Sequence, residues 1–243
     1  MISGRDRIST GPKARDVPLE RSMTELDPNV VKAAGLETAT ISDALDRLGI
    51  VGQCYRIEGR DPRFKLCGRA FTLLFGPAGR PAGTVGDFID DVPPGHIVVI
   101  DNGGRDDATI WGDILTEVAS RRGVGGTVID GICRDVQCCR DFQYPIFSKG
   151  HWMRTGKDRV QLEATNVPVT IGGARVAPGD IIVGDADGVI VIPHEHENAV
   201  LAAATEIFET EAAIRKACSQ GSSLRDARAQ LGYHKLQTRR TDD

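Results

Sequence analysis

Residues 96–130 constrain the fold more than any other stretch, because two short apolar runs flank an amphipathic segment. The runs HIVVID (96–101) and GTVID (126–130) have the length and the β-branched content of buried strands. Residues 112–122 place apolar side chains on one face of a helix, namely Ile114, Leu115, Val118 and Ala119. Strands joined through such a helix pair in parallel. The sequence therefore predicts a βαβ unit within an α/β fold.

Patterns elsewhere predict further elements. In the first half, helical patterns cover residues 24–34 and 40–49, and a strand pattern covers residues 67–75. A short helix is expected over residues 83–91. Thr40 or Ser42 is the expected N-cap of the second helix, and Asn102-Gly103-Gly104 is expected to end the strand that begins at His96. The second half predicts hairpin turns at Gly172-Gly173 and over residues 185–188. It also predicts two helices, over residues 195–219 and 223–231.

The 243 residues are interpreted as a flexible arm (1–22), a single domain (23–232) and a tail (233–243). The basic residues are scattered, which argues against a nucleic-acid partner. No apolar stretch is long enough to cross a bilayer, and the first residues lack the apolar core of a signal peptide. We therefore expect no membrane partner and a cytoplasmic protein, whose six cysteines are free thiols.

A candidate ligand site lies at the carboxyl ends of the two strands. The helix that starts at Gly112 has first-turn N–H groups without partners inside the helix, and these attract a carboxylate or phosphate. Asp113 lies in that first turn. Gly131 allows a sharp turn that brings Arg134 and Asp135 to the same edge, where they could bind an oxyanion and a hard cation. A helix-dipole acid and an exposed ion pair would explain the same residues without a function.

Several motifs resemble those of one family. The segments GDIL (112–115) and RGVGGTVIDGICRDV (122–136) resemble the signature of the RraA-like family. This family includes class II 4-hydroxy-4-methyl-2-oxoglutarate/4-carboxy-4-hydroxy-2-oxoadipate aldolases and regulators of ribonuclease E activity. Further matches are TISDALDRLG from Thr40, CGRAFTL from Cys67, PPGHIVVID from Pro93, PVTIGGARVAPGDIIVGDADGVIVIP from Pro168 and GSSLRDARAQLG from Gly221. The resemblance implies a layered β/β/α sandwich of the swivelling type, with a mixed sheet and flanking N- and C-terminal helices.

The resemblance also implies a role for each residue of the candidate site. By analogy with the aldolases, the helix start at Gly112 and the backbone amides of Ile114 and Leu115 would bind the carboxylate of pyruvate. Arg134 would contact the pyruvyl group and stabilise the enolate. The sequence matches the family pattern at these positions.

The metal site is implied in the same way. Asp135 would be the single direct protein ligand of Mg²⁺ or Mn²⁺, and Asp113 would orient a water of the metal shell for proton transfer. A further acid, either Glu209 or Glu211, is expected from a neighbouring subunit of a homotrimer or homohexamer with interface active sites.

These roles favour a divalent-metal-dependent pyruvate lyase that cleaves a 4-hydroxy-2-oxo acid and also decarboxylates oxaloacetate. No lysine lies in the motif to form a Schiff base, which argues against the other aldolase mechanism. The alternative is a non-catalytic regulator that binds a ribonuclease. Such regulators are typically shorter than this chain, and the retention of Arg134 and Asp135 also favours an enzyme. A lyase for another hydroxy acid is a third alternative.

Other polar motifs are given structural interpretations. His194-Glu195-His196 has metal-ligand residue types but is expected to open the last long helix. Asp185 and Asp187 are interpreted as turn residues. Gly103-Gly104 and Gly125-Gly126 lack the spacing of a nucleotide-binding fingerprint.

Overall fold

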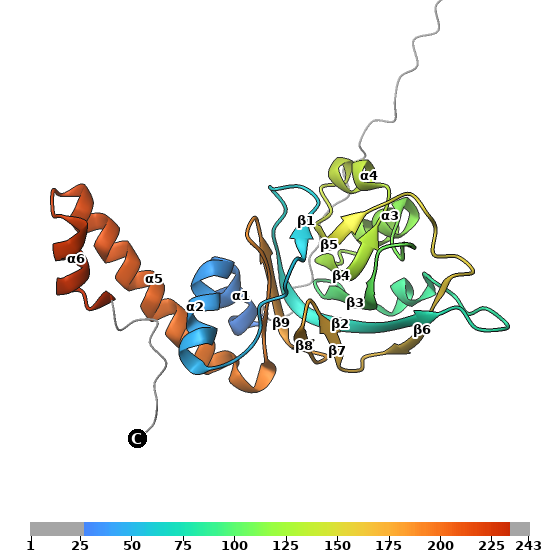
Figure 1. Cartoon of the computed structure of the whole chain (residues 1–243), viewed down its shortest axis with the longest axis horizontal. Coiled ribbons are helices and arrows are strands. Elements are labelled where there is room, and N and C mark those ends of the chain that lie inside the picture. Colours follow the sequence, from blue (N-terminus) through green and yellow to red (C-terminus); the bar gives the residue numbers. More distant parts are fainter. Residues whose placement is uncertain (1–26, 234–243) are drawn as a thin grey trace, which may run out of the picture.

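A computed structural model describes residues 27–233 of the chain. The predicted arm (1–22) and all of the predicted tail except Tyr233 lie outside these residues, and the division into arm, domain and tail stays a prediction. The described part is a mixed β-sheet with helices at both ends of the molecule (Figure 1). Its strands are β1 (Glu58–Gly59), β2 (Leu66–Pro77), β3 (Ile97–Arg105), β4 (Gly126–Cys133), β5 (Ile146–His151), β6 (Val160–Thr165), β7 (Val169–Ile171), β8 (Ala174–Val176), β9 (Ile181–Asp185) and β10 (Gly188–Ile192).

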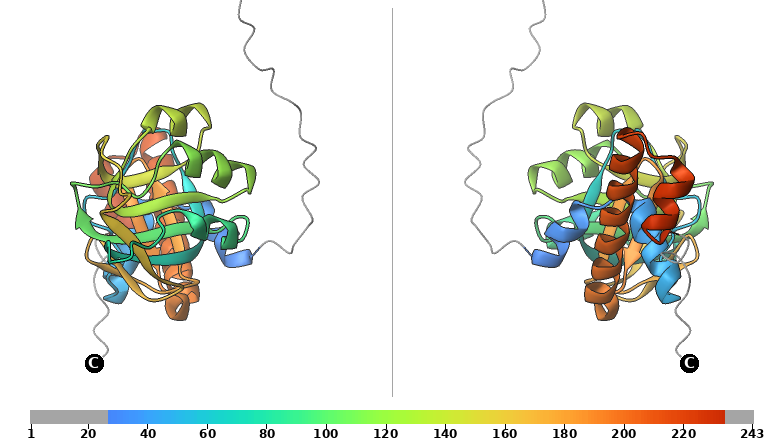
Figure 2. Two further views of the ribbon diagram at one scale, coloured as in Figure 1. Left: turned by 90° about the vertical axis from the view of Figure 1, so that its right-hand side faces the viewer. Right: turned by 90° about the vertical axis from the view of Figure 1, so that its left-hand side faces the viewer.

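The helices fall into two groups along the longest axis of the molecule (Figure 1). At one end α3 and α4, with the 3₁₀ helix η1, lie beside the parallel strands. At the other end α1, α2 and α5 cover β9 and β10, and α6 folds back along α5 (Figure 2). The bounds are α1 (Pro28–Ala34), α2 (Thr38–Leu48), η1 (Asp87–Asp91), α3 (Asp113–Arg121), α4 (Val136–Asp141), the 3₁₀ helix η2 (His194–His196), α5 (Glu197–Ser219) and α6 (Leu224–Gln230).

The predicted βαβ unit is confirmed. Strand β3 pairs with β4 in parallel, with Ile97 opposite Gly126, and α3 connects them. Strands β2, β3, β4 and β5 are all parallel neighbours, whereas β9 pairs with β2 and β10 with β9 in the antiparallel sense. The carboxyl ends of β3 and β4 therefore lie at one edge of the sheet, which is where α3 and α4 begin. The hairpin turns predicted at Gly172-Gly173 and over residues 185–188 are also present.

Several predicted boundaries were wrong. Strand β4 does not turn at Gly131 but continues through it to Cys133, so the turn that brings Arg134 and Asp135 to the edge of the sheet comes after Cys133. Asn102-Gly103-Gly104 does not end β3, because Gly103 and Gly104 adopt positive φ (62° and 69°) and carry the strand through a bulge to Arg105. Helix α2 begins at Thr38 rather than after Thr40 or Ser42. The carboxylate of Asp185 accepts hydrogen bonds from the N–H (2.9 Å) and hydroxyl (2.6 Å) of Thr38, so a residue far along the chain caps this helix.

The apolar interior consists of two clusters, one at each end of the molecule. The larger cluster lies around the parallel strands and includes Val98, Ile129 and Trp111. The smaller one fills the space between β9, β10, α2 and α5 and includes Ile41 and Leu201. Among the helices of residues 27–233, none has the length and apolar character that a bilayer crossing requires.

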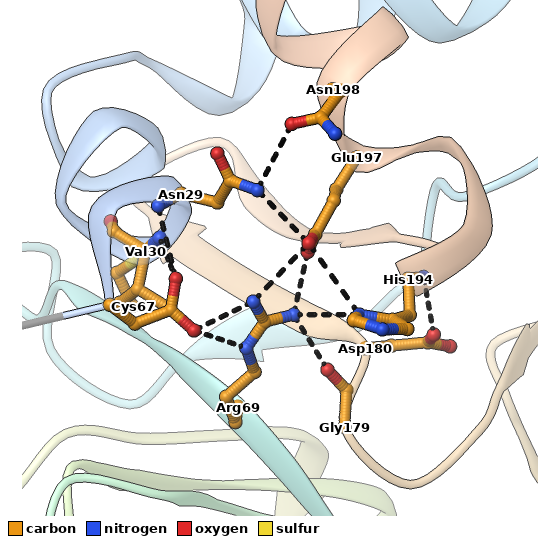
Figure 3. A network of polar contacts seen from close by, with 10 residues as sticks. Asn29, Val30, Cys67, Arg69, Gly179, Asp180, His194, Glu197 and Asn198 are labelled. Atoms are coloured by element: carbon orange, nitrogen blue, oxygen red, sulfur yellow. Dashed lines mark hydrogen bonds and ion pairs between the residues drawn. The ribbon is translucent and has the colours of Figure 1, made fainter.

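Arg69 on β2 joins the terminal helices to the sheet (Figure 3). Its guanidinium donates to Asp27, the N-cap of α1, at 2.7 Å and to Glu197, the first residue of α5, at 2.6 Å. A third bond reaches the carbonyl of Gly179 at 2.9 Å. His194 lies in the same network, at the start of η2, so the His194-Glu195-His196 motif does open the last long helix.

Candidate functional site

The start of α3 presents backbone donors to carboxylates. Its N-cap, Gly112, has no side chain to satisfy the first-turn N–H groups. Two of these groups are bound by acids of the chain itself: the N–H of Asp113 donates to Oδ2 of Asp135 (3.2 Å), and that of Ile114 donates to Oδ1 of Asp113 (2.8 Å). This helix start therefore suits carboxylate oxygens, as the sequence predicted.

Arg134 and Asp135 lie directly opposite this helix start. The N–H of Arg134 donates to the carbonyl of Trp111 (3.1 Å), which fixes the turn after β4 against the segment before α3. Asp135 is the N-cap of α4 and has a φ of 55°, a left-handed conformation that costs a non-glycine residue energy. This conformation holds its carboxylate beside the N–H of Asp113. The side chains of Arg134 and Asp135 are 37% and 39% exposed, and Nε lies 3.3 Å from Oδ2.

Gly112 allows the two segments to approach so closely. A Cβ atom at this position would lie 2.8 Å from Oδ2 of Asp135 and 3.1 Å from Nε of Arg134. The backbone of Gly112 is extended, so the requirement is for space rather than for an unusual dihedral angle. The four predicted residues Gly112, Asp113, Arg134 and Asp135 are thus brought into one constellation.

A cavity of about 400 Å³ opens beside this constellation. The start of α3 and Arg134 form one part of its wall, and apolar side chains of Val85, Ile89 and Val118 form another. Trp111 lines the cavity and is also part of the core, since it is 2% exposed and its Nε1 donates to the Thr116 hydroxyl at 3.0 Å. The volume suits a small organic ligand.

The sequence interpretation missed the remaining wall, which is a loop over residues 155–157. Thr155 forms a parallel β-bridge with Thr109, three residues before Gly112. A second hollow, of about 360 Å³, lies on the side of Asp135 and includes His151 and Trp152. No local pattern marks these residues, because long-range contacts bring them to the site.

Asp135 is suited to hold a magnesium ion. Mg²⁺ keeps several waters and takes one or two carboxylates, so a single half-exposed carboxylate beside a cavity fits it. A structural zinc site would need about four nitrogen or sulfur ligands. Within residues 27–233 no group of three or more His, Cys, Asp or Glu side chains could hold an ion.

Glutamates on α5 do not join the site within one chain, whereas a cysteine of α4 lies beside it. Glu209 and Glu211 lie on α5, at the opposite end of the molecule from α3 and α4 (Figure 1). The thiol of Cys138 lies 3.9 Å from the carbonyl of Asp113. Burial and the neighbouring carboxylates of Asp113 and Asp135 raise its pKa, so the thiol stays protonated and is a poor nucleophile.

Comparisons with known proteins point to one family. Residues 38–191 match the RraA-like family model, described as Aldolase/RraA. A putative 4-hydroxy-4-methyl-2-oxoglutarate aldolase of Halalkalibacterium halodurans is 33% identical over 82% of this chain and 91% of its own length. Protein DlpA of Legionella pneumophila is 38% identical over 85% of this chain, which spans only about a third (34%) of that longer protein.

Two solved structures share the fold. An uncharacterized protein from Pseudomonas syringae pv. tomato has a TM-score of 0.77 and 40% identity over 82% of this chain and 96% of its own. RraAS2 of Streptomyces coelicolor, described as an unusual member of the RNase ES inhibitor RraA protein family, has a TM-score of 0.72 and 28% identity over 77% of this chain and 96% of its own. With its mixed sheet, its flanking helices and this set of relatives, the chain belongs to the RraA-like family.

Proposed function

We propose that this protein is a divalent-metal-dependent pyruvate lyase, a class II aldolase that cleaves a 4-hydroxy-2-oxo acid. Decarboxylation of oxaloacetate is a second activity, because both reactions leave negative charge on the same pyruvate carbon. The observation that carries the proposal is the meeting of the α3 start with Arg134 and Asp135, where N–H donors, a guanidinium and a half-exposed carboxylate come together beside the cavity.

The first requirement of this chemistry is an anchored substrate carboxylate. The N–H groups of Ile114 and Leu115, beside the N-cap Gly112, supply donors at the positive end of α3. A bound carboxylate would take the place of the Asp113 side chain at the Ile114 N–H. Arg134 would then contact the 2-oxo oxygen and stabilise the charge that develops on it as the carbon–carbon bond breaks.

Asp135 would hold Mg²⁺ or Mn²⁺. The ion would supply positive charge to the 2-oxo and carboxylate oxygens of the substrate. Asp113, once displaced from the Ile114 N–H, would orient a water that takes the proton of the substrate's 4-hydroxyl group and returns a proton to C3, which becomes the methyl carbon of pyruvate. The roles of Arg134 and Asp113 are thus complementary, one for charge and one for the proton.

We further propose that the active form is a homotrimer or homohexamer. Glu209 and Glu211 belong to α5, which lies at the opposite end of the molecule from α3 and α4 (Figure 1). The half-exposed Trp152 and the exposed Met153 and Ile114 leave apolar surface around the site, which a neighbouring copy could cover. One of the two glutamates would then complete the site of a neighbour.

A pyruvate-release assay coupled to lactate dehydrogenase tests the proposal. Oxaloacetate and 4-hydroxy-4-methyl-2-oxoglutarate should both be turned over with Mg²⁺, and EDTA should stop the reaction. Turnover that EDTA leaves unchanged would contradict the metal mechanism. No turnover of any oxoacid would favour the second candidate function, a regulator that binds a ribonuclease. The similarity to the Streptomyces coelicolor protein, described as a member of an RNase ES inhibitor family, supports this candidate.

Gly112→Ala should lower kcat/KM about 10- to 100-fold, since misplacement by about an ångström has effects of this size. The new methyl group would push Asp135 and Arg134 away from the helix start. Both side chains are half-exposed and can move, so the melting temperature should change by less than about 4 °C. Steady-state kinetics and thermal denaturation followed by circular dichroism measure the two effects. Gly35→Ala is the control for a glycine substitution away from the site, because Gly35 has a φ of −85° and a Cβ atom there would make only an ordinary contact, 3.5 Å from the carbonyl oxygen of Lys32.

A further inference from the structure

A buried hydroxyl group connects the elements that form the candidate site. Thr116 lies on α3 and is fully buried. Its hydroxyl donates to the carbonyl of Gly112 at 2.9 Å and accepts from Nε1 of Trp111 at 3.0 Å. Its Oγ1 also lies 3.3 Å from Sγ of Cys139 on α4. One side chain therefore contacts the segment before α3, the N-cap of α3 and the neighbouring helix.

The hydrogen-bonding capacity of this hydroxyl is fully used. A threonine hydroxyl offers one proton and two lone pairs. The proton goes to the carbonyl of Gly112, so the indole N–H of Trp111 and the S–H of Cys139 take the lone pairs. Burial raises the pKa of Cys139 to about 11, so its thiol retains a proton to donate at neutral pH. Loss of the hydroxyl would remove all three bonds at once.

The contact with a second helix distinguishes Thr116 from other helical threonines. Thr205 and Thr210 on α5 also donate to the carbonyl four residues earlier, but among residues 27–233 their hydroxyls make no other hydrogen bond. A bond of that kind serves one helix. The hydroxyl of Thr116 joins two helices, each of which carries one half of the candidate site, because Gly112 is the N-cap of α3 and Asp135 that of α4.

The spacing between these two helix starts leaves little tolerance. The N–H of Asp113 donates to Oδ2 of Asp135 at 3.2 Å, and a Cβ atom on Gly112 would lie 2.8 Å from the same oxygen. The N–H of Cys139 donates to the carbonyl of Asp135 at 3.4 Å, so the residue that Thr116 contacts is tied back to Asp135 by the first turn of α4. A small shift of α4 against α3 would therefore break the contact between the α3 start and this carboxylate.

We propose that Thr116 is a positioning residue, whose hydroxyl holds the Asp135 carboxylate at the spacing from the α3 start that a bound metal ion and 2-oxo acid require. The proposal rests on the proposed function, in which Asp135 holds the ion and the first amides of α3 anchor the substrate carboxylate. An ion shared between Asp135 and the substrate would be bound less tightly if this spacing changed. Residues behind a metal ligand commonly alter metal affinity or activity by about 10- to 100-fold.

Thr116→Val tests this role, because valine keeps the shape of threonine and removes its hydroxyl. In the pyruvate-release assay with oxaloacetate, the Mg²⁺ concentration that gives half the maximal rate should rise about tenfold or more. Thr116→Ser keeps the hydroxyl and should stay within about twofold of the wild type. A loss of folded protein would lower the rate but not change this Mg²⁺ concentration, so the measurement separates positioning from stability.

Thr72→Val provides the matched control. Thr72 is also fully buried, and its hydroxyl donates to the carbonyl of Val167 at 2.6 Å from the middle of β2. This variant should lose stability, as Thr116→Val does, and keep the Mg²⁺ dependence of the wild type. Urea unfolding followed by circular dichroism measures the stabilities. An equal change in Mg²⁺ dependence in both variants would overturn the role of Thr116.

Crystal structures of the two Thr116 variants give a second readout that does not depend on activity. The distance from the nitrogen of Asp113 to Oδ2 of Asp135 should exceed about 3.5 Å in Thr116→Val and stay near 3.2 Å in Thr116→Ser. An unchanged distance, or an active Thr116→Val with the Mg²⁺ dependence of the wild type, would overturn the role of Thr116 while the proposed function stands. If the wild type releases no pyruvate, the proposed function fails, and the distance alone decides whether Thr116 positions Asp135.

Discussion

Asp135→Asn should reduce metal-dependent pyruvate release to less than about a thousandth of the wild-type rate, because it removes the one carboxylate that would hold the ion. Asparagine is nearly isosteric with aspartate. Its amide oxygen can still accept from the N–H of Asp113, and asparagine tolerates the left-handed conformation that Asp135 adopts at a φ of 55°. The substitution therefore changes the charge of the site while it keeps the turn before α4.

Two measurements separate a loss of metal from a loss of fold. Calorimetric titration with Mg²⁺ should show binding to the wild type and none to Asp135→Asn, while the two melting curves coincide. Asp113→Asn is the matched control, because Asp113 is proposed to move a proton rather than to hold the ion. It should bind Mg²⁺ as the wild type does and lose about 10²- to 10⁴-fold in kcat. A Mg²⁺-stimulated rate retained by Asp135→Asn would refute the metal assignment.

The part of the fold that local patterns determine could be predicted from the sequence. The apolar runs of β3 and β4, the amphipathic face of α3 and the glycine turns of the β7–β8 and β9–β10 hairpins all have characteristic spacings. Because β3 and β4 had to be parallel neighbours, Asp113 and the Arg134-Asp135 pair had to lie at the same edge of the sheet. The constellation of the site followed from this topology.

The features that depend on distant partners could not be predicted. Thr38 begins α2 because Asp185, 147 residues away, accepts its N–H. Strands β5 and β6 carry no clear alternation of buried and exposed residues and were missed, as was the short helix α4. The loop over residues 155–157 reaches the cavity only because it is fastened to Thr109. Local sequence patterns therefore identified candidate residues, whereas the long-range contacts that position these segments became visible only in the structure.

Arg69→Met should destabilise the folded protein by about 3–5 kcal/mol, because it leaves Glu197 buried without its cationic partner. The side chains of Arg69 and Glu197 are 18% and 9% exposed, and the network joins α1, β2 and α5 (Figure 3). Asp27 is 37% exposed, so water screens its share of the interaction. Urea unfolding followed by circular dichroism measures the loss. Arg121→Met, which breaks an exposed pair with Glu117 one helical turn away on α3, is the control and should cost about 0.5 kcal/mol or less.

The cost of Arg69→Met should depend on pH in a defined direction. Burial alone would raise the pKa of Glu197, but hydrogen bonds from Arg69 and Asn29 outweigh it and hold the pKa below its ordinary value. A folded-state pKa below the unfolded value of about 4.3 means that the ionised carboxylate stabilises the protein above that pH, and that this contribution is lost as the pH falls through the folded pKa.

In Arg69→Met, burial remains without the guanidinium, so Glu197 can relieve the cost by taking up a proton. The stability difference between the two proteins should therefore be full at pH 7 and shrink below about pH 4. Urea unfolding at several pH values between these limits checks this, and a difference that stays constant would show that Arg69 acts through its packing and not through the charge of Glu197.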